Sequence, residues 1–179
     1  MKNIKQTIIS NCQKFRYTLY RKIESVSNEN CLIFCMINPS TASVTENDAT
    51  IRKCIKIAEN QNCGHLYVVN LIPYRSPDVK EVETYLKNLN PLQIEKIIIE
   101  NFNYIDQVLS SFQNSVIICG WGKYDKIEQS ENLAKTFYKQ YHSYNLKALK
   151  INKDQSPIHP LFVNISTQLI DFNPDNLKK

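Results

Sequence analysis

The feature that most constrains the fold is the unbroken apolar run at residues 31–37, CLIFCMI. A run of this length, rich in branched and aromatic residues, predicts a strand that is buried on both faces. Such strands are typical of parallel sheets that helices cover on both sides. The run ends in the loop sequence NPSTA at residues 38–42. Because ligands of open α/β sheets bind beyond the carboxyl ends of the strands, this loop is the first place to expect a site.

Three further segments have the same apolar character, and helical patterns separate them. The expected strands are 31–37, 65–72, 115–119 and 145–151, and the expected helices are 49–61, 78–86, 91–112 and 127–142. Strands that alternate with helices predict an α/β fold, here a three-layer α/β/α sandwich with a four-stranded parallel central sheet. The alternating pattern of residues 15–22 predicts an additional antiparallel edge strand.

The two ends of the chain are expected to be peripheral. Residues 1–14 predict a short amphipathic helix, residues 164–171 predict a final short helix, and residues 172–179 are a polar tail. No repeat or low-complexity linker divides the sequence. With 179 residues, 42% of them hydrophobic, the chain is expected to form a single α/β domain over residues 1–179.

Composition narrows the classes of function. With three glycines a Gly-rich phosphate loop is not available, and a net charge of +5 is too mild to indicate nucleic acid by itself. The six cysteines form no CxxC pair and lie mostly in apolar segments, which favours buried free thiols over disulfides or a zinc site. We therefore expect no metal and no cofactor. Neither a membrane-spanning stretch nor a signal peptide is evident, so a cytoplasmic protein is expected.

Polar or unusual residues follow each of the expected parallel strands, and parallel strands bring their carboxyl ends to one edge of a sheet. Amides there offer a donor and an acceptor together, which suits the edge of a base, while hydroxyls, arginines and a helix N-terminus suit an anion. Aromatic rings suit stacking, and a histidine suits proton transfer. The candidate ligand-binding residues are Asn38, Pro39, Ser40, Thr41, Arg52, Asn70, Tyr74, Arg75, Trp121, Gly122 and His159.

Several of these residues also have a purely structural interpretation. Asn38 before a proline can simply form a turn, and Asp48 can act only as the N-cap of the helix that follows it. Trp121 can equally be a core residue. Arg16 and Arg21 on an edge strand are expected to lie at the surface or in ion pairs. The shared placement of the candidates, rather than any single residue, supports a site.

The order of the motifs resembles a bacterial and phage family of unknown function. The matching segments are FRYTLYR at 15–21, NPSTA at 38–42, DATIR at 48–52, an Asn-Leu pair with a later arginine at 70–75, WG at 121–122 and HPLF at 159–162. The resemblance spans about residues 15–165, nearly the whole chain. The family usually has an arginine before its His-Pro pair, where this chain has Ile158. An anion contact from that position is therefore not available.

The motif series is also similar to the uracil-DNA glycosylase superfamily, whose strand ends carry Gly-x-Asp-Pro-Tyr, Leu-Leu-Asn, Trp-Gly and His-Pro-Ser-Pro. The corresponding segments are MINPS at 36–40, VNL at 69–71, WG at 121–122 and HPL at 159–161. The resemblance implies a four-stranded parallel sheet with a base-sized pocket at its edge. Asn38 stands where those glycosylases have an Asp that orients water, and an amide cannot carry that charge. Base excision is therefore not the first expectation.

Three functions from different classes fit these observations. The first is a protein that binds a nucleotide or nucleotide-derived small molecule, in a phage as a sponge that sequesters a host immune signal. The second is a hydrolase or glycosylase-like enzyme acting on a glycosidic or phosphate bond, with His159 as acid or base and Asp48 as the carboxylate. The third is a DNA-binding repair protein, which requires a basic groove. If Asp48 only caps its helix, binding is favoured over the enzyme.

Overall fold

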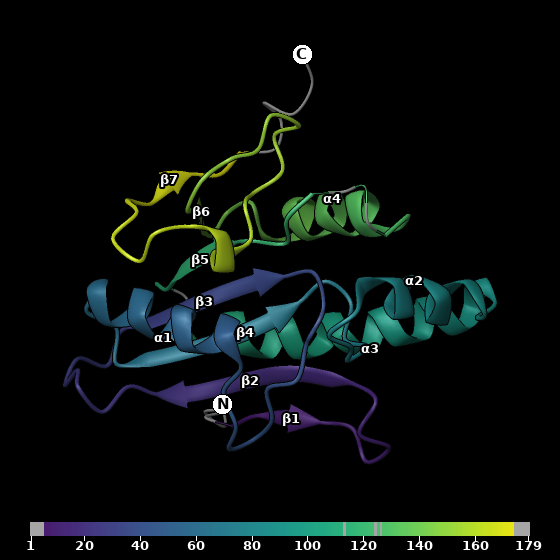
Figure 1. Ribbon diagram of the computed structural model, residues 1–179, viewed down its shortest axis with the longest axis horizontal. Coiled ribbons are helices and arrows are strands. Elements are labelled where there is room, and N and C mark those ends of the chain that lie inside the picture. Colours follow the sequence, from purple (N-terminus) through teal and green to yellow (C-terminus); the bar gives the residue numbers. More distant parts are fainter. Residues whose placement is uncertain (1–5, 113, 124, 126, 174–179) are drawn as a thin grey trace.

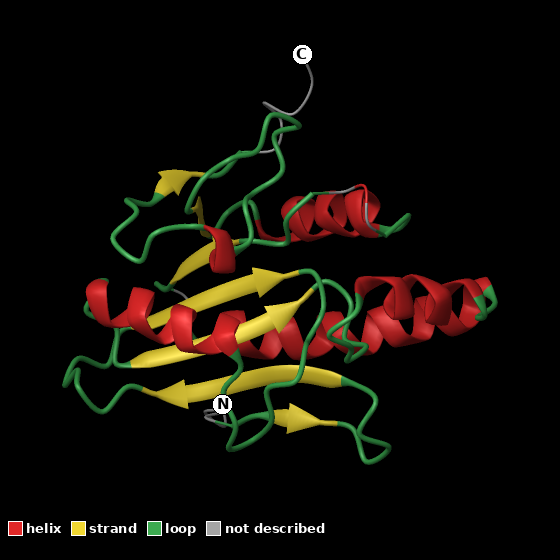
Figure 2. Ribbon diagram, in the orientation of Figure 1, coloured by secondary structure: helices red, strands yellow, loops and turns green. Residues whose placement is uncertain are grey.

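The computed structural model describes residues 6–112, 114–123, 125 and 127–173, which form one sheet and the helices around it (Figures 1 and 2). The strands lie in the order β1-β2-β4-β3-β5-β6-β7. Their bounds are β1 Ile8–Ile9, β2 Arg16–Lys22, β3 Cys31–Met36, β4 His65–Asn70, β5 Val116–Cys119, β6 Asn145–Ala148 and β7 Ile170–Asp171. The helices are α1 Ala49–Asn60, α2 Val79–Lys87, α3 Pro91–Ser111 and α4 Ser130–Tyr141, and a 3₁₀ turn, η2, covers Pro160–Phe162.

The apolar run that dominates the sequence forms β3 in the middle of the sheet. β3 pairs in parallel with β4 on one side and with β5 on the other, and β5 pairs in parallel with β6. Met36 lies opposite Asn70 and Cys35 lies opposite Cys119, so these strands end at the same edge. The α/β fold class is confirmed, but the sheet as a whole is mixed. Antiparallel pairings add β2 and β1 on one side and β7 on the other, where a single antiparallel edge strand was expected.

Alternate residues of β3 pack against different helices. Leu32 and Phe34 belong to a buried cluster that includes the apolar residues of α1, whereas Ile33 and Cys35 belong to a cluster that includes those of α3 and α4. Figure 1 shows α1 and α3 on opposite sides of the central strands. Because successive side chains of a strand point to opposite faces, an unbroken apolar run needs helices on both.

The N-terminal helix expected over residues 1–14 is wrong for the described residues, 6–14; residues 1–5 lie outside them. Ile8–Ile9 forms β1, which pairs antiparallel with β2. The amide of Ile8 donates to Oγ1 of Thr18 at 3.1 Å. β-branched residues suit a strand, and the pairing with β2 overrides a weak helical pattern. As a result β2 is not an edge strand.

The final helix expected over residues 164–171 is also wrong. Oδ1 of Asn164 accepts from the amide of Ser166 at 3.0 Å, a local turn of the kind that competes with a helix. β7 then pairs with β6, and the amide of Phe172 donates to the carbonyl of Leu146 at 3.1 Å. Phe172 is buried, so the segment expected to be a polar tail begins in the core; residues 174–179 lie outside the described part.

Candidate functional site

We use the term carboxyl edge for four segments of the chain, residues 38–42, 70–76, 120–122 and 157–160. The first two segments are the loops after β3 and β4. Nδ2 of Asn38 donates to the carbonyl of Ser76 at 2.9 Å, and the amide of Ser76 donates to the carbonyl of Pro39 at 2.9 Å. The amide of Leu71 donates to the carbonyl of Met36 at 2.9 Å. The two loops are therefore bonded to each other, and the Asn38 side chain takes part in that bonding.

The loops after β5 and β6 meet in the same way. The amide of Gly120 donates to the carbonyl of Cys35 at 2.8 Å, and the amide of Gly122 donates to the carbonyl of Pro157 at 2.9 Å. A Cβ atom added to Gly120 would lie 2.9 Å from Cδ of Pro160, and Gly122 has a φ of +80°. The chain segments that the sequence analysis grouped are thus gathered at one edge.

Asn70, the last residue of β4, is the most deeply placed polar candidate at this edge. Its side chain is 1% exposed, and neither Oδ1 nor Nδ2 has a hydrogen-bond partner among the described residues. Its backbone carbonyl accepts from Nδ2 of Asn101 on α3 at 2.7 Å. Asn101 is fully buried and was not among the candidate ligand-binding residues. An Asn within the apolar face of a helix is nevertheless a signal in the sequence that a buried polar contact exists there. The side-chain amide of Asn70 therefore offers a donor and an acceptor that no described residue uses.

Arg16 and Arg75 reach the same carbonyl oxygen. Nη1 of Arg16 donates to the carbonyl of Ala42 at 3.1 Å, and Nη2 of Arg75 approaches it at 3.4 Å. The Nε atoms of both arginines are buried and have no partner among the described residues. Arg16 is 2% exposed, so the expectation that it lies at the surface is wrong. The two guanidinium groups bring positive charge and unused donors beneath the NPSTA loop.

Arg21 and Arg52 bind the next part of the same loop. Nη2 of Arg21 donates to the carbonyl of Ser43 at 2.7 Å, and its Nε donates to Oδ1 of Asn47 at 2.7 Å. Nη1 of exposed Arg52 donates to the carbonyl of Asn47. The arginines of the 15–21, 48–52 and 70–75 motifs therefore converge on carbonyl and amide oxygens of residues 42–47.

Asp48 caps α1. Its Oδ1 accepts from the amide of Ile51 at 2.8 Å, and its Oδ2 accepts from the amide of Ala42 at 3.3 Å. Burial lowers the pKa of Arg16 to about 10, and the negative charge of Asp48 opposes that shift. Burial also lowers the pKa of Arg21, again opposed by Asp48. The carboxylate therefore acts as a helix cap and as a counter-charge for the buried arginines.

The two aromatic candidates are packed against other rings. Trp121 is 3% exposed and meets Phe137 and Phe172 edge-on, with ring centroids 6.0 and 5.4 Å apart. Tyr74 is half-buried and stacks on Tyr85 at 3.9 Å with an interplanar angle of 10°. Trp121 is thus placed as the core interpretation predicted, and it does not present a stacking surface to solvent.

His159 lies at the start of η2, close to the loop after β5. Its Nδ1 accepts from the amide of Leu161 at 3.3 Å, and its Cβ lies 3.8 Å from a Cβ built on Gly122. The ring of Phe162 lies 5.9 Å from that of His159 and is 75% exposed. Phe162 was not a candidate, although it ends the HPLF motif. Ser40 is half-buried and Thr41 is exposed at the same edge.

A family match covers the segments described above. The family described as "Protein of unknown function (DUF1643)" matches residues 16–161. The chain belongs to the DUF1643 family. The DUF1643 match includes every candidate residue at the carboxyl edge and begins at the buried Arg16. No curated protein and no solved structure matches the chain.

Two cavities of the DUF1643 chain lie away from the carboxyl edge. One, of about 410 Å³, lies where β3 and β5 begin, and the other, of about 500 Å³, lies along α3. Within the described residues, no group of three or more His, Cys, Asp or Glu side chains could hold a metal ion. All six cysteines are free thiols. In the part of the chain that the structure describes, no helix has the length and apolar character to span a membrane.

Proposed function

We propose that the protein binds a nucleotide or nucleotide-derived small molecule at the carboxyl edge of its sheet and does not turn it over. The observation that carries this proposal is the amide of Asn70. A buried donor or acceptor without a partner costs about 1–3 kcal/mol, and Asn70 leaves one of each without a partner among the described residues. A base edge, which presents a donor beside an acceptor, is the complementary group.

Arg16 and Arg75 supply the second half of the recognition. Asn70 follows Leu66 and Val68 on the face of β4 that packs against the α1 side, and Arg16 interacts with Asp48 at the start of α1. Guanidinium groups hold phosphate oxygens in charge-assisted, often bidentate bonds. In the proposed complex, phosphate oxygens replace the Ala42 carbonyl as the acceptor for Arg16 and Arg75.

This exchange also explains how a ligand reaches buried groups. Asn70 is 1% exposed and the 42–47 loop lies over the arginines, held through its carbonyls. A ligand phosphate that takes over those donors releases the loop, so that entry of the ligand and movement of the loop are one event. The exposed ring of Phe162, beside His159, then offers the stacking surface that Trp121 does not.

The contacts of Asp48 support binding over catalysis. Both of its oxygens accept from backbone amides, those of Ile51 and Ala42, which is the arrangement of a helix cap rather than of a base directed at a ligand. Asn38 donates its amide to the Ser76 and Pro39 carbonyls, so it too is engaged in the loop. A pocket that binds without turnover suits a sponge, and we propose sequestration of a host immune nucleotide by a phage-encoded protein as its role.

The arrangement of the central strands supports the resemblance to the uracil-DNA glycosylase superfamily. Four neighbouring strands, β4, β3, β5 and β6, pair in parallel, and the NPS, NL, WG and HPL segments follow them in that superfamily's motif order. We propose that the protein uses a glycosylase-like base pocket without the acidic residue, so that the base is held rather than excised.

The test begins with the protein purified from cells, denatured, and examined by mass spectrometry for released small molecules. In parallel, thermal unfolding is followed with nucleoside mono- and diphosphates, cyclic dinucleotides and ADP-ribose. Recovery of an unchanged nucleotide, or a rise in the melting temperature with one of them, is the expected result. No recovered nucleotide and no shift with any of these ligands would overturn the proposal.

A variant separates binding from folding. Asn70→Leu removes both unpaired atoms at nearly constant volume, so it is expected to keep or raise the melting temperature of the free protein and to abolish the ligand-induced rise. Asn103→Ala, an exposed change on α3, is the control and retains the full ligand effect. A wild-type ligand response in Asn70→Leu would show that the amide does not contact the ligand.

A further inference from the structure

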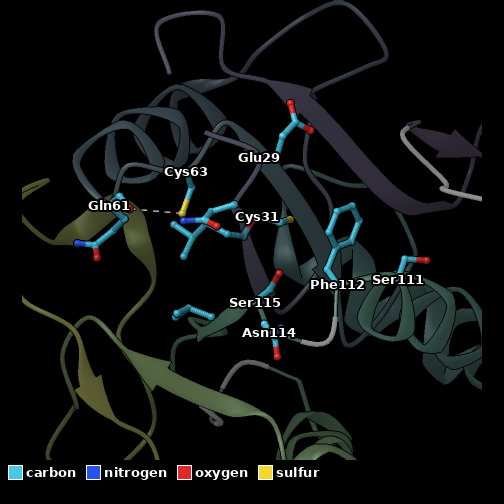
Figure 3. Close-up of a pocket in the computed structure, with 11 residues that line it drawn as sticks. Glu29, Cys31, Gln61, Cys63, Ser111, Phe112, Asn114 and Ser115 are labelled. Carbon is cyan, nitrogen blue, oxygen red and sulfur yellow. Dashed lines mark hydrogen bonds between the residues drawn. The ribbon is translucent and has the colours of Figure 1, made fainter. Parts of the chain in front are cut away.

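The outer side of α3 presents apolar side chains to solvent. Leu92 is 75% exposed and Ile99 is 55% exposed. The cavity of about 500 Å³ that they line is bounded by α3 alone, whereas residues of several segments line the cavity of about 410 Å³ in Figure 3. We call the residues that line the α3 cavity the α3 face. They are Leu92, Glu95, Lys96, Ile99, Glu100 and Asn103.

The α3 face lies opposite the side of the helix that packs on the sheet. Leu92 and Ile99 are seven residues apart, which is two helical turns, so they share one side of α3. The buried residues of the helix lie on the other side; they are Asn101, Phe102, Ile105, Val108 and Leu109. In Figure 1, α3 begins beside the end of α2, beyond the ends of β3 and β4. The first turns of α3 therefore carry apolar side chains that the core does not use.

Two opposite charges lie between the exposed apolar residues. Among the described residues, neither Glu95 nor Lys96 forms an ion pair or a side-chain hydrogen bond. Glu100 differs, because its carboxylate bonds with Tyr17 and adds to the burial that raises the pKa of that tyrosine. Glu95 and Lys96 are thus the charges of the α3 face that remain available to a partner.

The order of these residues is complementary to itself when it is reversed. Leu92 comes three positions before Glu95, and Ile99 comes three positions after Lys96. In an antiparallel pair of α3 helices whose two-fold axis passes between Glu95 and Lys96, Leu92 lies opposite the partner subunit's Ile99. Glu95 then lies opposite the partner subunit's Lys96. A parallel pair would instead place like charges side by side, so the charge pattern selects the antiparallel arrangement.

We propose that the α3 face is the interface of a symmetric homodimer of this chain. The two-fold axis makes every contact occur twice: two apolar layers of Leu92 with Ile99, and two ion pairs of Glu95 with Lys96. One helix from each copy makes a small interface, so the dimer is weak and depends on concentration. No residue of the α3 face belongs to the carboxyl edge, and the dimer does not depend on the function proposed there.

Analytical ultracentrifugation of the full chain, from about 5 µM to about 1 mM, tests for the dimer. The expected result is a reversible change from one chain to two as the concentration rises. A monomer at every concentration would overturn the proposal. A species larger than a dimer would also overturn it, because a two-fold interface closes with two copies.

Exchange of the charges tests the arrangement of the two helices. Lys96→Glu and Glu95→Lys each place like charges opposite each other twice, so each is expected to weaken dimerisation about tenfold or more. An equimolar mixture of the two variants restores opposite charges and is expected to associate as the wild type does. Lys56→Glu, the same change on the exposed side of α1, is the control and keeps wild-type dimerisation. Wild-type dimerisation of both single variants, or no association in their mixture, would contradict the antiparallel pairing.

Ile99→Asp tests the apolar layer. Because Ile99 is exposed in the single chain, the variant is expected to keep the melting temperature measured at low concentration and to lose the dimer. Ile170→Asp, which changes an exposed isoleucine outside the α3 face, is the matched control and retains the dimer. A folded Ile99→Asp variant that dimerises like the wild type would show that this face is not the interface.

Discussion

Arg16 is a charged side chain in a buried position, where apolar side chains are the rule. It is 2% exposed, its Nη1 atom donates to the Ala42 carbonyl, and its neighbours include the like charges of Arg75 and Arg21. Burial of a guanidinium costs free energy that only good hydrogen bonds and a counter-charge repay. Here Asp48 provides the counter-charge and the 42–47 loop provides acceptors.

Truncation of Arg16 is therefore expected to destabilise the protein. Arg16→Ala removes a buried hydrogen bond to a charged group and leaves a void, which together lower the free energy of unfolding by about 2–4 kcal/mol. Arg16→Met keeps much of the volume and removes the buried charge, so it is expected to lose less. Urea unfolding of the two variants measures the difference. Equal stability of Arg16→Ala and the wild type would show that the side chain is not buried as described.

At this scale the sequence predicted residue types better than residue environments. Asp48 as an N-cap and Trp121 as a core residue were both foreseen as structural alternatives, because capping and burial are local or compositional tendencies. Burial of Arg16 was not foreseen, because β2 was expected at an edge. The two-residue β1 and the 42–47 loop cover it, and neither is visible in the pattern of residues 15–22.

The start of α1 depends on its cap. Asp48 accepts from the Ile51 amide and also from the Ala42 amide, so it ties the helix to the loop. Asp48→Ala is expected to lower the free energy of unfolding by about 1–2 kcal/mol through the lost cap, with the lost counter-charge for Arg16 added to this. Asp48→Asn keeps an oxygen for the cap and loses only the counter-charge, so it is expected to lower the free energy of unfolding less. Chemical denaturation measures both, with Lys56→Ala on the exposed face of α1 as the control. If Asp48→Ala were as stable as the control, the cap would contribute nothing.

The loops after β5 and β6 depend on close packing. A Cβ on Gly120 would lie 2.9 Å from Cδ and 3.2 Å from Cγ of Pro160, so Gly120→Ala is expected to lower the free energy of unfolding by about 1–3 kcal/mol. A double-mutant cycle measures the contact itself. Pro160→Ala is expected to be less harmful, or to be favourable, in the Gly120→Ala background. Strictly additive effects would show that the two loops do not press on each other.

Helices and strands could be predicted from the sequence where the residues of the segment itself specify its structure. The apolar runs of β3 and β4 and the capping box of α3, in which Asn90 and Gln93 exchange bonds, are written locally in the sequence. β1 and β7 have two residues each, too few to produce a period, and they exist because β2 and β6 offer open edges. The two helices that were wrongly expected lie at the two ends of the chain. In both places, pairing with a neighbouring strand makes the segment a strand instead.

The topology of the whole molecule gathers positive charge at the carboxyl edge of its sheet. In a strand–helix–strand unit the helix begins near the carboxyl edge and ends near the amino edge. The carboxyl edge accordingly combines the N-terminus of α1, which carries partial positive charge, with Arg16 and Arg75. Asp48 caps that helix and offsets part of the charge.

The buried thiols of the core make the free energy of unfolding depend on pH. Burial raises the pKa of Cys35, Cys54 and Cys119 above the ordinary value of 9.0. Above pH 9 the unfolded chain releases these protons while the folded chain keeps them, so the folded state binds more protons and the free energy of unfolding falls as pH rises. Below pH 9 both states hold the protons and these groups contribute no pH dependence. Each fully buried thiol adds a slope of about 1.4 kcal/mol per pH unit.

Urea unfolding under reducing conditions, between about pH 7 and pH 10, tests this expectation. Cys54→Ala is expected to flatten the decline above pH 9, because one buried thiol no longer titrates in the unfolded chain alone. Cys12→Ala is the matched control, because Cys12 is exposed and its hydrogen bond to Ser10 lowers rather than raises its pKa, so the decline above pH 9 is expected to match that of the wild type. Tyrosines such as Tyr67, whose pKa burial also raises, act in the same direction in all three proteins and cancel in the comparison. Parallel profiles for Cys54→Ala and the wild type would mean that the Cys54 thiol is open to solvent. The layer between α1 and the sheet, in which this thiol lies, would then be open to solvent as well.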